Sequence, residues 1–131
     1  MISDAFFAPA EEEVDILFFE VGDIVYGTDA SQVLRIDRSF EDDLSLPELG
    51  PLKRGHRALV FDAPEGEGHL KVDSIRGVRP VPIQHLRRLP PVVGAASYTV
   101  GVFLDDARPV MLIDLLETLT FKEGTEGNVA R

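Results

Sequence analysis

Short runs of apolar and β-branched residues, separated by turn-forming residues, recur along the whole chain. The first two runs are separated by Gly22 and Asp23, a pair typical of a tight hairpin turn. Glycine, proline and acidic residues separate the next two pairs of runs in the same way. The pattern therefore predicts three β-hairpins, built from residues 14–20 with 24–26, 57–61 with 69–72, and 99–104 with 109–113.

Residues 31–37 alternate in the manner of a half-buried strand, which predicts Val33 and the methylene groups of Arg35 on one face. In the strand that continues from residue 70 the alternation changes phase before Ile75, and this change predicts a β-bulge near Asp73 and Ser74. We therefore expect a bent strand at this point of the chain.

Helix signals are few and short. Residues 82–86 can form one helical turn that begins with proline, and the prolines at 90 and 91 stop anything longer. Asp114 can cap a helix over residues 115–121, with three leucines on one side. About seven short strands with hardly any helix predict an all-β fold of small antiparallel barrels, not a layered α/β fold.

The composition divides the chain into regions. The stretch between Ser39 and Gly55 holds three consecutive acids, two prolines and two glycines, and indicates a loop. We expect a flexible acidic arm at residues 1–13, a domain at 14–121 and a flexible tail at 122–131. Within the domain, a first half at 14–38 and a second half at 57–121 are joined by a linker at 39–56.

The net charge of −10 is unevenly distributed. Residues 1–50 hold 13 acids and 2 bases, residues 51–100 hold 4 acids and 8 bases, and residues 101–131 hold 6 acids and 3 bases. A negative total argues against nucleic-acid binding, and the basic middle region lacks interleaved aromatic residues. The separation of acidic and basic stretches favours protein partners, although solvated surface charge explains any single residue equally well.

The 131 residues suit one domain with a core of its own. The chain contains no cysteine, which removes disulfides, thiolate nucleophiles and cysteine-bound metals. No apolar run approaches the ~20 residues of a membrane span, and residues 1–10 lack the features of a secretory signal. We therefore expect a cytoplasmic protein that does not insert into a membrane.

Candidate catalytic groups are scattered. The three histidines, His56, His69 and His85, are too far apart in sequence for the short spacing of a metal site, and no serine has a Gly-x-Ser-x-Gly setting. Asp73 and Asp114 interrupt apolar stretches, and we expect them to accept hydrogen bonds at the bulge and at the helix start. The sequence thus predicts no catalytic residue, metal or cofactor.

Four motifs follow one another at suitable spacing between residues 14 and 119. They are Tyr26-Gly27-x-Asp29, Val33-x-x-Ile36, Val72-Asp73-x-Ile75-x-x-Val78 and Ile113-Asp114-Leu115. With these motifs, most of residues 14–119 resembles a CheW-like domain. Such domains are non-catalytic couplers of bacterial chemoreceptors to a CheA-type histidine kinase. The resemblance implies two SH3-like barrels packed together, with receptor binding near the seam between them.

The resemblance also implies an incomplete first barrel. The family places a much longer segment, including a Gly-Val-x-Asn-Leu-Arg-Gly stretch and another strand, where this chain has only residues 37–56. Its partner-contacting arginine has no counterpart here. An incomplete barrel exposes strand edges, so we expect homo-oligomerisation or partner binding by strand addition.

The family's receptor-contacting strand corresponds to Val33 and Ile36, and the strand across the seam to Ile75 and Val78. These four residues are candidates for an apolar docking groove, and barrel core is an equally good explanation. Arg76 and Arg79 on the same strand are candidates for steering a partner electrostatically.

The expected function is a CheW-like adaptor for a chemoreceptor cytoplasmic tip and a kinase regulatory domain. Two alternatives remain. One is a scaffold that has lost kinase coupling and acts by receptor binding or self-assembly, and the other is a small-ligand-binding β-barrel or small hydrolase.

Overall fold

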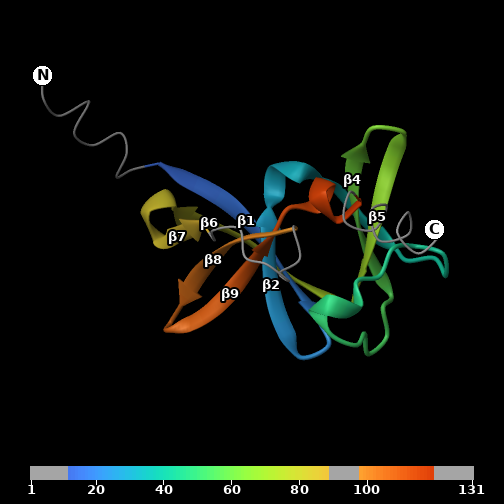
Figure 1. Ribbon diagram of the computed structural model, residues 1–131, viewed down its shortest axis with the longest axis horizontal. Helices are drawn as coiled ribbons and strands as arrows, with labels where there is room; N and C mark the ends of the chain where they lie inside the picture. Colours follow the sequence, from blue (N-terminus) through green and yellow to red (C-terminus); the bar gives the residue numbers. More distant parts are fainter. Residues whose placement is uncertain (1–11, 89–97, 120–131) are drawn as a thin grey trace, which may run out of the picture.

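The computed structural model describes residues 12–88 and 98–119, and these form two β-sheets and a short helix (Figure 1). The predicted arm, the end of the predicted helix and the predicted tail lie largely outside the described residues. Nine strands are present in the described part, in agreement with the predicted all-β class. Their bounds are β1 Glu13–Val21, β2 Ile24–Asp29, β3 Val33–Arg38, β4 Arg57–Ala63, β5 Gly66–Val72, β6 Ser74–Pro82, β7 Leu86–Arg88, β8 Thr99–Asp105 and β9 Arg108–Ile113.

The larger sheet has the strand order β6-β1-β2-β9-β8-β7 and takes strands from both sides of the 39–56 linker. All its neighbouring strands are antiparallel except β2 and β9, which are parallel. Phe18 of β1 and Phe103 of β8 are three strands apart in this order, yet their ring centroids are 6.1 Å apart. Three strand spacings in a flat sheet would span about 14 Å, so the sheet curls into a barrel.

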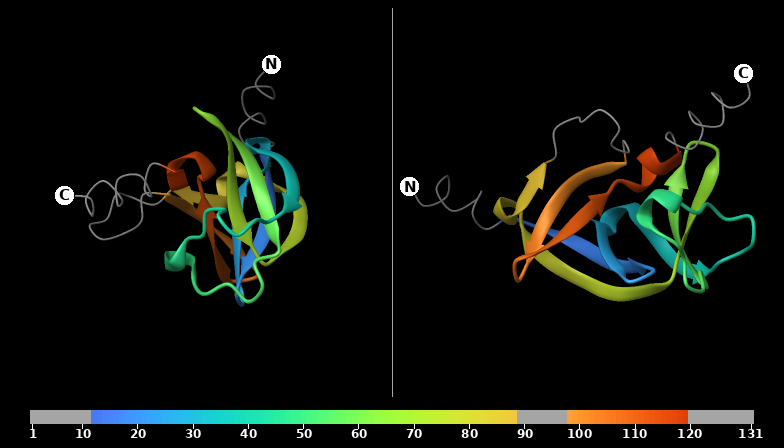
Figure 2. Two further views of the ribbon diagram at one scale, coloured as in Figure 1. Left: turned by 90° about the vertical axis from the view of Figure 1, so that its right-hand side faces the viewer. Right: turned by 60° about the horizontal axis from the view of Figure 1, so that its bottom comes forward.

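The smaller sheet has the order β3-β4-β5 and lies at the opposite end of the molecule from β7 (Figure 1). Strand β6 runs from beside this sheet along the barrel toward β7, as the long yellow strand in the right-hand view of Figure 2 shows. The three predicted hairpins are confirmed as β1–β2, β4–β5 and β8–β9. Asp106 and Ala107 both have positive φ, 49° and 69°, at the turn of the last hairpin.

Strand β1 separates two apolar cores. Successive side chains of a strand point to opposite faces, so Ile16 and Phe18 enter the core of the barrel while Leu17, Phe19 and Val21 enter a larger core. The larger core lies between the outside of the barrel and the three-stranded sheet, with Leu59, Phe61, Leu70 and Val72 from that sheet among its members. All of these side chains are at most 3% exposed.

One predicted detail of strand register is wrong, and another is displaced along the chain. The register of β3 on β4 shifts between Val33 and Arg35, which puts these two side chains on opposite faces of the sheet, not on the same face as predicted. The predicted bulge is present in β6, but it lies at Arg76, because Phe18 pairs with Gly77 while Phe19 pairs with Ile75. Asp73 and Ser74 instead form the corner between β5 and β6, where the backbone leaves one sheet and joins the other.

Short helical segments follow the predicted capping signals. A 3₁₀ turn at Ile83–His85 follows Pro82, and Asp114 precedes a helix at 115–119. The carboxylate of Asp114 accepts hydrogen bonds from the backbone N–H groups of Leu116 and Glu117, at 3.1 and 3.4 Å. The predicted capping role of Asp114 is therefore confirmed. Two further 3₁₀ turns span Ala30–Gln32 and Pro47–Leu49.

Candidate protein-binding surface

The four apolar candidates lie on two edge strands, β3 and β6. Val33 and Ile75 are half-buried and both pack against the larger core. Ile36 and Val78 are exposed, by 43% and 53%. The sequence could not decide between core and surface for this set, and the structure divides it equally between them.

Strand pairing explains what the four candidates share. Residues directly opposite each other on neighbouring strands point to the same face of a sheet. The partners of Val33 and Ile36 are Phe61 and Leu59, and the partners of Ile75 and Val78 are Phe19 and Leu17. All four partners belong to the larger core, so the candidates lie at the rim of that core. We call Val33, Ile36, Ile75 and Val78 the core rim.

The two arginine candidates point differently. Arg76 lies at the bulge and pairs with Glu20, with 3.1 Å between Nη1 and Oε2. Arg79 lies opposite Ile16, which places it on the barrel-interior face and away from Val78. The structure therefore does not bring Arg79 together with the core rim.

Arg79 has partners of its own at the barrel. Its Nη2 lies 3.0 Å from Oδ2 of Asp105, at the end of β8. Its guanidinium carbon lies 4.3 Å from the ring centroid of Phe18, a cation–π arrangement. Both candidate arginines remain more than half exposed, so they contribute to the charge that a partner meets.

Asp73 organises the corner from which β6 starts. Its Oδ1 accepts hydrogen bonds from the backbone N–H groups of Arg54 and Gly55, both at 2.7 Å, and its Oδ2 accepts one from Gly22 at 2.6 Å. The N–H of Lys53 is 3.0 Å from each oxygen. Burial alone would raise the pKa of this carboxyl group, but the four N–H donors outweigh it and lower the pKa to about 2.

The expected backbone partners of Asp73 are thus confirmed, although they come from the turn after β1 and from the linker. The sequence indicated that Asp73 accepts hydrogen bonds, because this aspartate interrupts an apolar stretch. The residues that donate to it lie between 18 and 51 positions away in the chain, and nothing in the local pattern identifies them. Asp73 fixes the linker and the β1–β2 turn to the start of β6, and so holds the strand that carries Ile75 and Val78.

Sequence reasoning missed Leu34. It is 52% exposed and lies in β3 at the register shift, between Val33 and Arg35. Alternation with its neighbours was the available signal, but the shift removes the regular period on which that signal depends. Leu34 and Ile36 together make β3 an exposed strand with two large apolar side chains.

On the other face of the same sheet, charged side chains form a compact network. Arg35 donates two hydrogen bonds of 2.7 Å to the two carboxylate oxygens of Glu67 and one of 3.0 Å to Asp37. These bonds raise the pKa of Arg35, and the hydrogen bond from Arg35 lowers the pKa of Glu67. The network keeps Arg35 and Asp37 on the face opposite to Ile36.

The described residues contain no group of three or more histidine, cysteine or acidic side chains that could hold a metal ion. None of the helices in residues 12–88 and 98–119 is long and apolar enough to cross a membrane.

A hollow of about 180 Å³ lies beside the linker, lined mainly by apolar side chains, with Lys71 as its one charged residue among those described.

Comparison with known proteins identifies relatives of this fold. The chain is 63% identical over 105 residues to the Frizzy aggregation protein FrzB of Myxococcus xanthus, a match that covers 80% of this chain and 94% of FrzB. The solved structure of the scaffolding protein TtCheW from Thermoanaerobacter tengcongensis superposes with a TM-score of 0.65 at 20% identity, over 80% of this chain and 91% of TtCheW. No family model matches the chain. The identity to FrzB and the shared fold confirm the predicted family, and the chain belongs to the CheW-like chemosensory adaptor and scaffolding proteins.

Proposed function

We propose that this adaptor binds the cytoplasmic tip of a chemoreceptor through the core rim and acts in the cytoplasm. The observation that carries the proposal is the common placement of Val33, Ile36, Ile75 and Val78 at the edge of one core. Single exposed apolar residues are ordinary on a protein surface. Here Val33 and Ile75 pack against the core, and Ile36 and Val78 lie on the same face of their strands with their apolar surface exposed, which makes them available as anchors for a partner.

The second proposed partner is the regulatory domain of a CheA-type histidine kinase. Membership of the CheW-like family supports this partner. In the resulting complex the protein would link receptor and kinase without taking part in any chemical step.

A scaffold that binds a receptor without coupling a kinase is the alternative. The short linker favours it, because residues 39–56 contain one 3₁₀ turn and a single bridge, Leu44 to Leu70, and add no strand to the smaller sheet. FrzB is also a short protein, since 105 residues make up 94% of it.

A small-ligand barrel or hydrolase has less support. Asp73 and Asp114, the acids that such a site would need, are engaged by backbone N–H groups at a strand corner and at a helix start. Among the described residues that line the hollow beside the linker, Lys71 is the one side chain suited to acid–base chemistry, and a hydrolase would need a second.

Titration against a receptor cytoplasmic hairpin tip and, separately, a kinase regulatory domain tests the proposal. We expect Ile36→Glu and Val78→Glu each to weaken receptor binding about 10-fold or more, as for a lost interface anchor worth ~1–3 kcal/mol. Leu104→Glu is the matched control, because Leu104 is 60% exposed on β8, away from the core rim. Equal weakening by all three variants would contradict the assignment of the surface.

The two binding partners separate the alternatives. Binding to both supports the coupling adaptor, and binding to the receptor tip alone supports the scaffold without kinase coupling. Binding to neither refutes the proposed function. Arg76→Gln and Arg79→Gln should change mainly the association rate and its salt dependence, which stopped-flow mixing at two ionic strengths measures.

A further inference from the structure

The described part of the chain has four strands at sheet edges, and three of them are protected. A parallel bridge covers β5, where the N–H of Leu44 donates to the carbonyl of His69 and the N–H of Lys71 donates to the carbonyl of Leu44. Strand β6 carries two prolines and a glycine with a φ of 120°, and β7 is three residues long. Prolines, irregular backbone, short strands and covering loops all prevent an edge from pairing with another chain.

Strand β3 contains no proline, and its one irregularity, the register shift at Leu34, lies at its start. It pairs with β4 on one side, and no strand of the described residues pairs with its other side. From Arg35 to Arg38 its pairing with β4 is regular, so the backbone is straight enough to accept a further strand. Leu34 and Ile36 expose 52% and 43% of their surface on this strand.

The charges along β3 are complementary to those of a second, antiparallel copy of the same strand. When two antiparallel copies pair with Ile36 opposite Ile36, Arg35 of each copy lies opposite Asp37 of the other. Opposite charges that face each other across two strands stabilise the pair, and like charges in these positions destabilise it. We propose that two copies of this chain associate through β3, as a two-fold symmetric antiparallel pair centred on Ile36.

Each face of the sheet contributes to this register. Ile36 pairs with Leu59 and so lies on the core face, where the two copies of Ile36 would meet beside the larger core. Arg35 and Asp37 pair with Val60 and Ala58, which puts both on the opposite face. Three N–H groups of Arg35 are bound within its own chain, two to Glu67 and one to Asp37, which leaves two for a second copy, and the carboxylate of Asp37 has further acceptor positions.

The pairing follows from a strand edge and its charges and does not rest on the proposed receptor binding. Ile36 also belongs to the core rim, so a receptor bound there would compete with the second copy. Sedimentation and light scattering of the purified chain therefore test it without any partner. We expect a mass that rises from monomer to dimer with concentration. We also expect slower exchange of alternate β3 amides at concentrations where the dimer is present.

Charge-reversed variants test the register. Arg35→Asp alone and Asp37→Arg alone each place like charges opposite each other, and each should weaken association about 10-fold or more. In an equimolar mixture of the two variants, a mixed pair places an aspartate opposite an arginine at both of these positions. The mixture should then associate as the unaltered chain does, which also shows that both variants fold.

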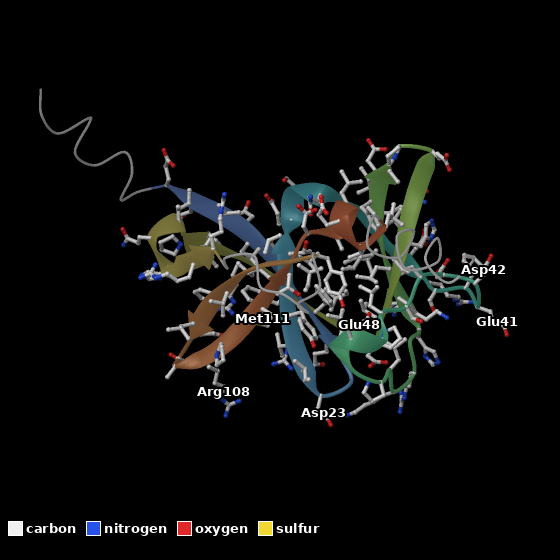
Figure 3. All side chains as sticks on the ribbon, viewed as in Figure 1. Asp23, Glu41, Asp42, Glu48, Arg108 and Met111 are labelled. Carbon is white, nitrogen blue, oxygen red and sulfur yellow. The ribbon has the colours of Figure 1, made fainter. Side chains whose placement is uncertain are left out.

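The matched control is Arg108→Asp. Arg108 lies at the β8–β9 hairpin, at the other end of the molecule from Glu41 and Asp42 beside the smaller sheet (Figure 3). It should leave association unchanged. A monomer at all concentrations with unprotected β3 amides would overturn the proposal, as would single variants that dimerise normally or a mixture that fails to recover.

Discussion

Replacing Asp73 should destabilise the protein by removing an anchor between three segments of the chain. In Asp73→Asn, one carbonyl oxygen can still face the N–H groups of residues 53–55, but the new amide group would point its own hydrogens at the N–H of Gly22. Two donors would then face each other at a site where the carboxylate oxygen now lies 2.6 Å from the Gly22 nitrogen. The variant keeps the size of the side chain, so any change in the free energy of unfolding measures the contribution of the hydrogen bonds and the charge.

The lowered pKa of Asp73 sets the expected loss of folding free energy. Lowering it from 3.8 to about 2 corresponds to about 2 kcal/mol of folding free energy at neutral pH, before a discount for the part of the carboxylate that water reaches. We therefore expect Asp73→Asn to lower the free energy of unfolding by about 1–2 kcal/mol at pH 7. Urea denaturation followed by circular dichroism measures this difference.

The pH dependence supplies a second readout. Because the pKa of Asp73 is lower in the folded than in the unfolded state, its contribution is complete above pH ~4 and is lost as the pH falls toward 2. The difference in stability between the unaltered chain and Asp73→Asn should therefore be constant from pH ~7 to pH ~5 and should shrink between pH ~4 and pH ~2.

Asp62→Asn is the matched control, since Asp62 is an exposed carboxylate on β4. It should change the free energy of unfolding by less than about 0.5 kcal/mol. A loss as small as this in Asp73→Asn, or a loss that stays the same down to pH ~2, would refute the role assigned to the four N–H donors.

Three further substitutions test other contacts by urea denaturation. Gly22→Ala should cost about 1–2 kcal/mol, because Gly22 has a φ of 63° and a Cβ there would lie 2.7 Å from the carbonyl oxygen of Pro51; a smaller loss would contradict the tight turn. Tyr26→Phe should cost about 1–2 kcal/mol, since the buried hydroxyl donates to the carbonyl of Leu49 at 2.6 Å, and an unchanged midpoint would argue against that bond. Asp114→Ala should cost about 1 kcal/mol through the lost helix cap, with Asp114→Ser as the variant that restores stability.

The local features of the fold could be predicted from the sequence because their causes are local. Turn residues and apolar runs suffice for the three hairpins, and the position of Asp114 suffices for the helix start. The parallel pairing of β2 with β9 joins strands from opposite ends of the domain, and no short pattern specifies it. The predicted strand register differs from the structure at Arg35 and Arg76, because a bulge shifts every later side chain to the other face.

The candidate surface was predictable in part. The resemblance identified the strands that carry the core rim, whereas the exposure of each residue depends on which neighbour covers it. Ile36 and Val78 are exposed because their strands are the last in their sheets, a property of topology that the sequence does not state. The donors of Asp73 were unpredictable for the same reason, since a folded loop brings them there.

The shared use of β1 by two cores has a consequence for how this protein can be divided. A fragment that starts at residue 57 would lack Ile16 and Phe18 and could not fill the barrel, even though it carries four of the six strands of the larger sheet. A fragment that ends at residue 56 would lose β6 and β9, the two neighbours of the β1–β2 hairpin.

Neither product of a cut in the linker would therefore be a folding unit, and the two cores should melt in one transition. A substitution in β1 affects both cores at once. The linker is also tied to the larger core through Leu46 and Leu49, and to Asp73 through the N–H groups of residues 53–55. Variation among relatives of this protein should accordingly be narrow in the nine residues of β1.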